Sequence, residues 1–290
     1  MAVIVDRNTR VIVQGITGSQ GQFHTGQMLA FGTNIVGGVN FKKAGSEVHG
    51  VPVFATVHEA VEKTGANASV MFVPAPGVKD AAFEAIHAGI KVLVLIPEHV
   101  PTQETMEIMA YAKQHGVRVI GPNTFGIISP GEKCKMGIMP NHIYKPGPVG
   151  IVARSGTLSY EIAYNLSNAG FGQTTVIGMG GDRVIGTNFV DALELFNADP
   201  ATEAIVMVGE IGGIQEELAA EYIKEHVRKP VVAYLAGKSA PPGKRMGHAG
   251  AIIEGNRGTY QSKVEALTAA GVKVAALPWE IVDLMREALK

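Results

Sequence analysis

The chain has 290 residues, of which 46% are apolar and 18% are charged, a composition typical of a folded globular protein. The 25 Lys and Arg residues nearly balance the 26 Asp and Glu residues, and the resulting net charge of −1 excludes nucleic-acid binding driven by a strongly basic face. The length lies near the size at which a single hydrophobic core splits, so we expect two domains.

The only cysteine, Cys134, excludes an intramolecular disulfide and any CxxC metal or redox site. Asp6 and Arg7 stand where a secretory signal would need an apolar stretch, and apolar runs such as Ala204–Val208 are far shorter than the ~18–20 residues of a membrane span. We therefore expect a protein of the cytoplasm with no membrane segment. A mitochondrial matrix location would require that a transit peptide had been removed.

In the first part of the chain, short Val-, Ile- and Leu-rich runs alternate with amphipathic stretches, the pattern of parallel strands joined by helices. The predicted strands are Val11–Gln14, Asn34–Val39, Ser69–Val73, Lys91–Ile96 and Arg118–Ile120. The predicted helices are Gln20–Phe31, Val78–Ala88 and Pro101–His115.

A second series of the same kind follows a stretch rich in Pro and Gly. Its predicted strands are Val149–Ala153, Thr174–Ile177, Glu203–Val208, Val231–Ala236 and Val272–Ala275, and its predicted helices are Gly156–Asn168, Gln215–His226, Gly258–Ala270 and Glu280–Leu289. The sequence thus predicts an α/β fold, with domains at residues 1–123 and 148–290 and an ordered connection at 124–147.

The first predicted strand runs into a glycine turn and a helix, an arrangement that directs backbone N–H groups at an anionic phosphate. Gly15, Gly18 and Gly21 have the spacing G-x-x-G-x-x-G, which differs from the G-x-G-x-x-G of dinucleotide enzymes and weakens an NAD assignment. The alternative is a tight turn whose helix is capped by Thr17 or Ser19, with no ligand.

Two lysines follow the second predicted strand, where an NAD site would place an acidic residue. Lys42 and Lys43 suit a nucleotide that carries an extra ribose phosphate, either NADP or coenzyme A. A solvated pair of surface charges is the other interpretation.

A second candidate anion site lies in the second domain, where Ser155-Gly156-Thr157 links a strand to a helix that also carries Tyr160. The sequence is not G-x-S-x-G, so a hydrolase nucleophile is not supported. Simple N-capping by Ser155 or Thr157 is the alternative.

His248 lies in a loop between Gly247 and Ala249-Gly250, neighbours that leave its ring open to a bulky reactant. A carboxylate such as Glu210, at the end of another predicted strand, could fix its tautomer and stabilise the imidazolium. An ordinary loop histidine is the alternative. No histidines have the spacing of a metal site, so we expect none.

The segment Ala236-Gly237-Lys238-Ser239 ends like a Walker A loop, but Val232 stands where the first glycine of that motif would be. We therefore expect no site for Mg-NTP in this chain. Energy-coupled chemistry would need a nucleotide brought by a partner chain.

Taken together and in this order along the chain, these motifs resemble those of the α subunits of succinyl-CoA synthetases. The resemblance runs through Gln14–Gly21, Gly121–Asn123, Arg154–Leu158, Gly209–Gly213 and Gly243–Gly250. It implies a Rossmann-like CoA-binding domain, then a flavodoxin-like ligase domain, and a β subunit whose ATP-grasp fold binds ATP or GTP with Mg²⁺. The substrates would be CoA, succinate and phosphate. After Gly121-Pro122-Asn123 the family often has Cys-Pro, whereas this chain has Thr124-Phe125.

By matched position the resemblance also implies roles for single residues. His248 would be the phosphorylated histidine and Glu210 the glutamate that orients it. The residues that would hold CoA are Thr17, Gly18, Ser19, Gln20, Lys43, Ile96, Pro97 and Glu98, and those that would hold phosphate and substrate are Ser155, Gly156, Thr157 and Tyr160.

Two other classes of function remain open at this point. One is an NADP-dependent oxidoreductase, favoured by the glycine turn with Lys42 and Lys43. The other is a non-catalytic, CoA-responsive binding module, which would not need an exposed His248. The sequence does not decide between ATP and GTP, between αβ and α2β2 assembly, or between succinate, malate and citrate.

Overall fold

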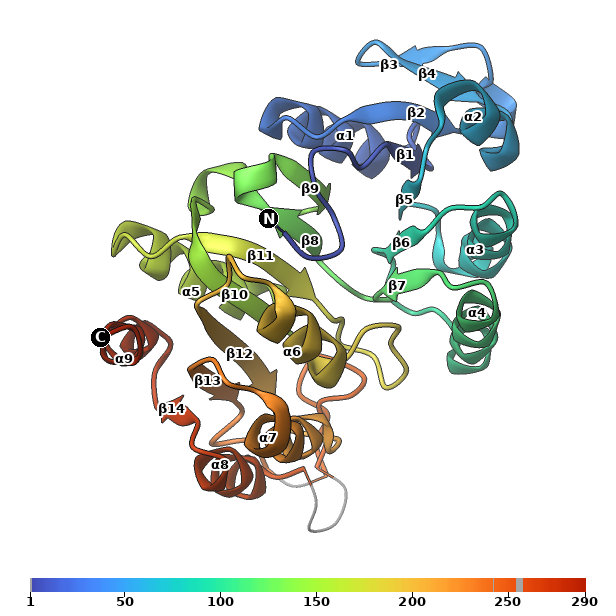
Figure 1. Ribbon diagram of the computed structural model, residues 1–290. Coiled ribbons are helices and arrows are strands. Elements are labelled where there is room, and N and C mark those ends of the chain that lie inside the picture. The colour runs from blue at the N-terminus through green and yellow to red at the C-terminus, as the bar shows by residue number, and fades with distance from the viewer. Residues whose placement is uncertain (1, 242, 254–257) are drawn as a thin grey trace.

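The computed structural model describes residues 2–241, 243–253 and 258–290, and these form two seven-stranded sheets flanked by helices (Figure 1). No helix within these ranges has the length and apolar character needed to cross a bilayer. The predicted α/β class is confirmed.

The first sheet has the strand order β3-β4-β2-β1-β5-β6-β7, with β3 antiparallel to β4 and the others parallel. Its strands are β1 (Val11–Gln14), β2 (Ile35–Val39), β3 (Glu47–Val48), β4 (Val51–Phe54), β5 (Ala68–Met71), β6 (Val92–Leu95) and β7 (Arg118–Ile120). Its helices are α1 (Ser19–Phe31), α2 (Val57–Thr64), α3 (Val78–His87) and α4 (Thr102–Gln114).

The second sheet has the order β14-β13-β12-β10-β11-β8-β9. Its strands are β8 (Gly126–Ser129), β9 (Cys134–Gly137), β10 (Pro146–Ala153), β11 (Gln173–Gly178), β12 (Ala204–Glu210), β13 (Val231–Ala236) and β14 (Lys273–Ala275). Its helices are α5 (Gly156–Asn168), α6 (Phe189–Ala198), α7 (Gln215–His226), α8 (Tyr260–Ala269) and α9 (Ile281–Ala288).

Helices cover both faces of the second sheet. Successive side chains of a strand point to opposite faces, so neighbouring residues of β10 pack in different cores. Val152 packs in one core with α6, α7 and α8, whereas its neighbours Ile151 and Ala153 pack in another with α5 and α9. This alternation explains why the strands read as continuous apolar runs in the sequence.

The two sheets share one hydrophobic core. Met28 of α1 lies in the same cluster as Cys134 and Met136 of β9, and the hydroxyl of Thr33 donates to the carbonyl of Lys135 and accepts from its N–H. Figure 1 shows α1 beside β9, between the two sheets. The relative position of the sheets is therefore fixed by packing.

Within 124–147, expected as a connection, the structure places β8 and β9, and both belong to the second sheet. Strands β3, β4, β8 and β9 and helices α2 and α6 were not predicted. Of the residues that suggested a loop, Pro130 and Gly131 form the short turn between β8 and β9, whereas Pro146 and Gly147 begin β10. The domain limits at 123 and 148 stay a prediction.

The pairing of β8 with β9 provides a test of this fold. Gly126 has φ +106°, and a Cβ added there would lie 2.1 Å from the carbonyl oxygen of Met136. Gly126→Ala should therefore destabilise the protein by about 2–4 kcal/mol, measured by urea unfolding. Gly131→Ala is the control, because its Cβ would meet nothing closer than 3.9 Å. Equal unfolding midpoints for the two variants would contradict this arrangement.

Candidate functional site

Four functional groups lie at one edge of the second sheet, where the parallel strands β10 to β13 end. Arg154 follows β10, Asp182 follows β11, Glu210 ends β12, and the loop after β13 carries His248. Because parallel strands present their carboxyl ends at the same edge, residues that are far apart in sequence meet there.

The ring of His248 is held by the carboxylate of Glu210. The Nδ1 atom lies 2.9 and 3.0 Å from the two carboxylate oxygens, and the side chains are 29% and 8% exposed respectively. This hydrogen bond raises the pKa of His248 above its ordinary value, and burial opposes the shift. With Nδ1 donating to the carboxylate, Nε2 is left as the nitrogen with a free lone pair.

Glu210 is in turn held by a buried cation. The Nε atom of Arg154 lies 3.3 Å from Oε1 of Glu210, and its Nη1 donates to the carbonyl of Gly212 at 3.0 Å. A Cβ on Gly250 would lie 2.6 Å from Nη2 of Arg154, so the loop passes directly over the guanidinium. The carboxylate thus has a cation on one side and an imidazole on the other.

Backbone hydrogen bonds tie the histidine loop to both domains. Gly250 donates to the carbonyl of Gly181, Gly181 donates to that of Asn123, and Asn123 donates to that of Pro97, at 3.0, 3.1 and 2.9 Å. A Cβ on Gly181 would lie 2.4 Å from the ring of His248, so only glycine fits there. The amide of Asn123 also donates to Asp182 at 3.0 Å.

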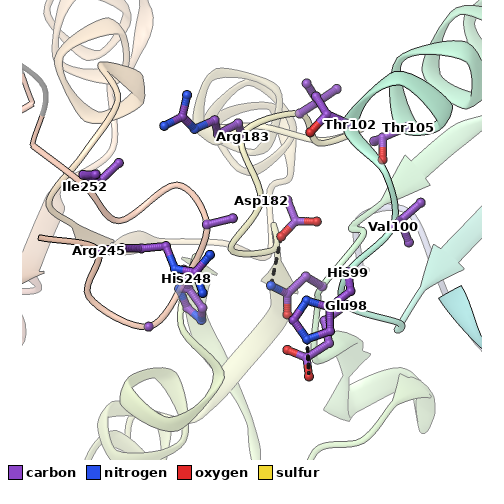
Figure 2. Close-up of a pocket in the computed structure, with 14 residues that line it drawn as sticks. Glu98, His99, Val100, Thr102, Thr105, Asp182, Arg183, Arg245, His248 and Ile252 are labelled. Carbon is purple, nitrogen blue, oxygen red and sulfur yellow. Dashed lines mark hydrogen bonds and ion pairs between the residues drawn. The ribbon is translucent and has the colours of Figure 1, made fainter.

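A cavity of about 350 Å³ separates the histidine loop from the first domain (Figure 2). Glu98 and His99 lie across it from His248, and Asp182 lies between them. The cavity is therefore lined by both domains.

A further cavity of about 370 Å³ is also lined by His248, and the start of α5 forms part of its wall. It is lined by Ile96, Glu98, Asn123, Thr124, Phe125, Ile138, Arg154, Ser155, Gly156, Thr157, Tyr160 and His248. Burial raises the pKa of Tyr160 to about 12, so its hydroxyl stays protonated and can donate. The structure thus brings the predicted phosphate and substrate residues together with His248, Ile96 and Glu98.

The start of α5 is not capped by a side chain. Ser155 is the N-cap residue, but its hydroxyl makes no capping hydrogen bond, and the hydroxyl of Ser159 donates to the carbonyl of Gly156. The capping alternative for Ser155 or Thr157 is therefore not observed. The first turn of α5 lines the cavity, and the uncapped start of a helix favours a bound anion through its N–H groups and the helix dipole.

The helix that follows the first glycine turn, α1, also begins without a side-chain cap. Gly18 is the N-cap with no side-chain cap, so capping by Thr17 or Ser19 is not observed either. A Cβ on Gly21 would lie 2.2 Å from the carbonyl oxygen of Gly15, which shows how tightly the turn is closed. Uncapped N–H groups at the start of a helix favour a bound anion such as a phosphate.

Lys43 is linked to this turn through Asn40. The Asn40 amide donates to the Thr17 hydroxyl at 2.6 Å, and its side-chain oxygen accepts the N–H of Lys42 at the start of the short 3₁₀ helix Phe41–Lys43. Thr17–Gln20 and Lys43 form a group at the edge of the first sheet, and they do not line either cavity around His248.

Sequence reasoning missed the parts played by Asn123, Arg154, Gly181 and Asp182. Asp182 lies just after a strand of a parallel sheet, and this position could have identified it as a candidate site residue. Arg154 follows β10 and could have been identified in the same way. Across the residues that the structure describes, no three His, Cys, Asp or Glu side chains are grouped as metal ligands.

Two family models match the chain, the CoA binding domain at residues 6–99 and the CoA-ligase domain at residues 152–273. The ATP citrate lyase of Methanothrix soehngenii, solved with citrate and coenzyme A, matches 99% of this chain with a TM-score of 0.89 and 27% identity. This chain spans half the length of that one.

Curated relatives match over the whole chain. Subunit alpha 2 of the ADP-forming succinate–CoA ligase of Archaeoglobus fulgidus is 59% identical over 289 residues, covering 100% of both chains. The corresponding alpha subunit of Staphylococcus aureus is 52% identical, over 100% of this chain and 96% of the relative. On this evidence the chain belongs to the family of succinate–CoA ligase α subunits.

Proposed function

We propose that this chain is the α subunit of an ADP-forming succinate–CoA ligase. With a β subunit it would interconvert succinyl-CoA, phosphate and ADP with succinate, CoA and ATP through a phosphohistidine, as in the citric acid cycle. The observation that carries the proposal is the Nδ1–carboxylate hydrogen bond between His248 and Glu210, which leaves the lone pair of Nε2 free on a ring that lines the cavity at the start of α5.

In this proposal each residue of the site has a task in the reaction. A phosphate oxygen attacks the thioester carbon of succinyl-CoA, the C–S bond breaks, and CoA leaves as the thiolate. Nε2 of His248 then attacks the phosphorus of succinyl phosphate, and the P–O bond to succinate breaks. Glu210 keeps the proton on Nδ1 and stabilises the charge that develops on the ring.

The start of α5 would hold the phosphate during both steps. Phosphoryl transfer needs mainly placement and charge stabilisation, and the uncapped N–H groups of Gly156 and Thr157 supply both without reorganisation. Tyr160 lines the same cavity with a protonated hydroxyl and would donate to the succinate carboxylate.

CoA would lie between the two domains. Its phosphates fit Thr17, Gly18, Ser19, Gln20 and Lys43, and its thiol end fits Ile96, Pro97 and Glu98, which follow β6. The support is that Ile96 and Glu98 line the cavity that contacts His248, while Pro97 is hydrogen-bonded to Asn123.

The nucleotide and Mg²⁺ would belong to the β subunit, with an ATP-grasp fold. In support, Val232 lies inside strand β13, so the Lys238 segment cannot form a Walker A loop. The relatives' names contain ADP-forming, which supports ATP over GTP as the nucleotide in this proposal. The cytoplasmic location stays a prediction.

Family membership argues against the two alternative functions. An NADP-dependent oxidoreductase would have no use for a histidine that is held by Glu210 and shares a cavity with the start of α5. A CoA-responsive binding module would not need Nε2 of His248 to be accessible.

The central test is phosphate labelling of the assembled αβ enzyme with γ-labelled ATP. The wild type should carry an acid-labile, base-stable phosphate, and His248→Asn should carry none because the attacking nitrogen is gone. His99→Asn is the matched control, since His99 lines the same cavity and has no part in the reaction. Label on His248→Asn at the wild-type level would overturn the proposal.

The raised pKa of His248 predicts the pH dependence of this labelling. Only the neutral ring can attack, so the single-turnover rate should fall on the acid side through a pKa above the ordinary 6.5. Glu210→Gln removes the largest cause of the shift, so it should move this acid limb to lower pH and slow labelling roughly tenfold or more. An unmoved limb would show that Glu210 does not hold the Nδ1 proton.

The CoA assignment predicts a selective loss of affinity in Lys43→Ala. If its ammonium binds the 3′-phosphate of CoA, the Kd for CoA should rise roughly five- to tenfold, with little change for dephospho-CoA. Titration calorimetry on the αβ enzyme measures both constants. An equal loss for the two ligands would place Lys43 elsewhere in the site.

A further inference from the structure

Three charged side chains are linked to Glu210 or to one another near it, and none of them contacts a reacting atom in the proposed reaction. They are Arg154, Glu216 of α7 and Lys263 of α8; Glu216 and Lys263 are fully buried and Arg154 is 6% exposed. Taking charges out of water is costly unless they are closely paired. A set of this kind beside a reactive histidine calls for an explanation.

Glu216 contacts every other member of the set. Its Oε1 accepts the backbone N–H of Glu210 at 3.1 Å and lies 3.4 Å from Nη1 of Arg154, while its Oε2 accepts from the ammonium of Lys263. The carbonyl of Gly212 accepts from both Arg154 and Lys263, at 3.0 and 2.8 Å. Glu216 therefore fixes both the backbone of Glu210 and the cation that faces its carboxylate.

The charges of these three side chains balance once the carboxylate of Glu210 is counted with them. Lys263 pairs with Glu216, and this leaves the charge of Arg154 to balance that of Glu210. The four groups together are therefore neutral when His248 is neutral. Removing one buried charge would upset this balance at short range, where solvent screens least.

We infer that Glu216 and Lys263 are positioning residues of the phosphohistidine reaction. They hold Arg154 and the backbone of Glu210 in place and balance the charge behind Glu210, so that its carboxylate keeps the proton on Nδ1 of His248. The inference rests on the proposed function and adds to it two residues, from α7 and α8, that touch no reacting atom.

Other charged groups also face His248 or Lys263. Asp182, Glu98, Arg183 and Arg245 line the cavity beside the ring, and Glu217 lies 4.0 Å from the Lys263 ammonium. Glu98, Arg183 and Arg245 are exposed, so water screens them. None of these five groups is altered in the Lys263 and Glu216 variants, so each variant is compared against the same surrounding charges.

The test is the pH profile of single-turnover labelling by γ-labelled ATP in the αβ enzyme, for Lys263→Met, Glu216→Gln and the double variant. Lys263→Met leaves an excess negative charge, which favours the protonated ring, so its acid limb should move to higher pH by about one unit. Glu216→Gln leaves an excess positive charge and should move the limb to lower pH by a similar amount. The double variant is balanced again and should return close to the wild-type profile.

Lys135→Met is the matched control. Lys135 is also a fully buried lysine, but it lies on the edge strand β9 and donates to the carbonyl of Met139 and to Asn141. Its replacement should lower the melting temperature and leave the pH profile of labelling where it is.

Structural damage alone would not move the acid limbs of the two single variants in opposite directions and restore the wild-type profile in the double variant. Unmoved limbs in both single variants, or shifts in the same direction that the double variant retains, would overturn the inference. Absence of label on wild-type His248 would instead overturn the proposed function. Single-turnover rate constants do not depend on the folded fraction, and if Lys263→Met fails to fold, Glu216→Gln and the double variant decide the question.

Discussion

The hydrogen bond between Glu210 and Nδ1 of His248 is the contact on which the rest of the site depends. A neutral imidazole has two tautomers, and only the one with the proton on Nδ1 leaves Nε2 able to attack phosphorus. The carboxylate selects this tautomer and later faces the cation that forms. The anion site at α5 and the cavities beside the ring are useful only if this selection is made.

The structure surrounds this bond with features that hold it in place. Arg154 contacts the carboxylate from behind, and the absence of a side chain at Gly181 makes room for the ring. The uncapped start of α5 lines the same cavity as the ring of His248, so an anion bound there would meet helix N–H groups beside the histidine. Each of these features either positions a reacting group or stabilises charge, and phosphoryl transfer depends mainly on these two effects.

The sequence allowed much of this to be predicted, because the features involved are local. Strand β1, the start of α1 and the start of α5 are visible as apolar runs that meet glycine or serine turns. Glu210 and His248 could be paired because both follow strands of a parallel sheet, where the ends converge. The family resemblance then supplied their roles, which periodicity alone could not have given.

What could not be predicted depends on contacts between distant segments. Strands β8 and β9 pair through Gly126 and Gly137, residues that favour a loop when each is considered separately. Glu216 and Lys263 occur in helical stretches with other charged residues, where a solvated face is the ordinary interpretation. Only the packing of α7 against α8 shows that both are buried.

The core shared by the two sheets has a consequence for how ligands bind. Because α1 is packed against β9, the walls that the two domains contribute to the cavities beside His248 are joined during folding, before any ligand arrives. A ligand that bridges the two domains then finds its contacts already spaced and loses little binding energy to assembling them. In this chain, the burial of apolar residues such as Met28, far from the reacting atoms, contributes indirectly to affinity.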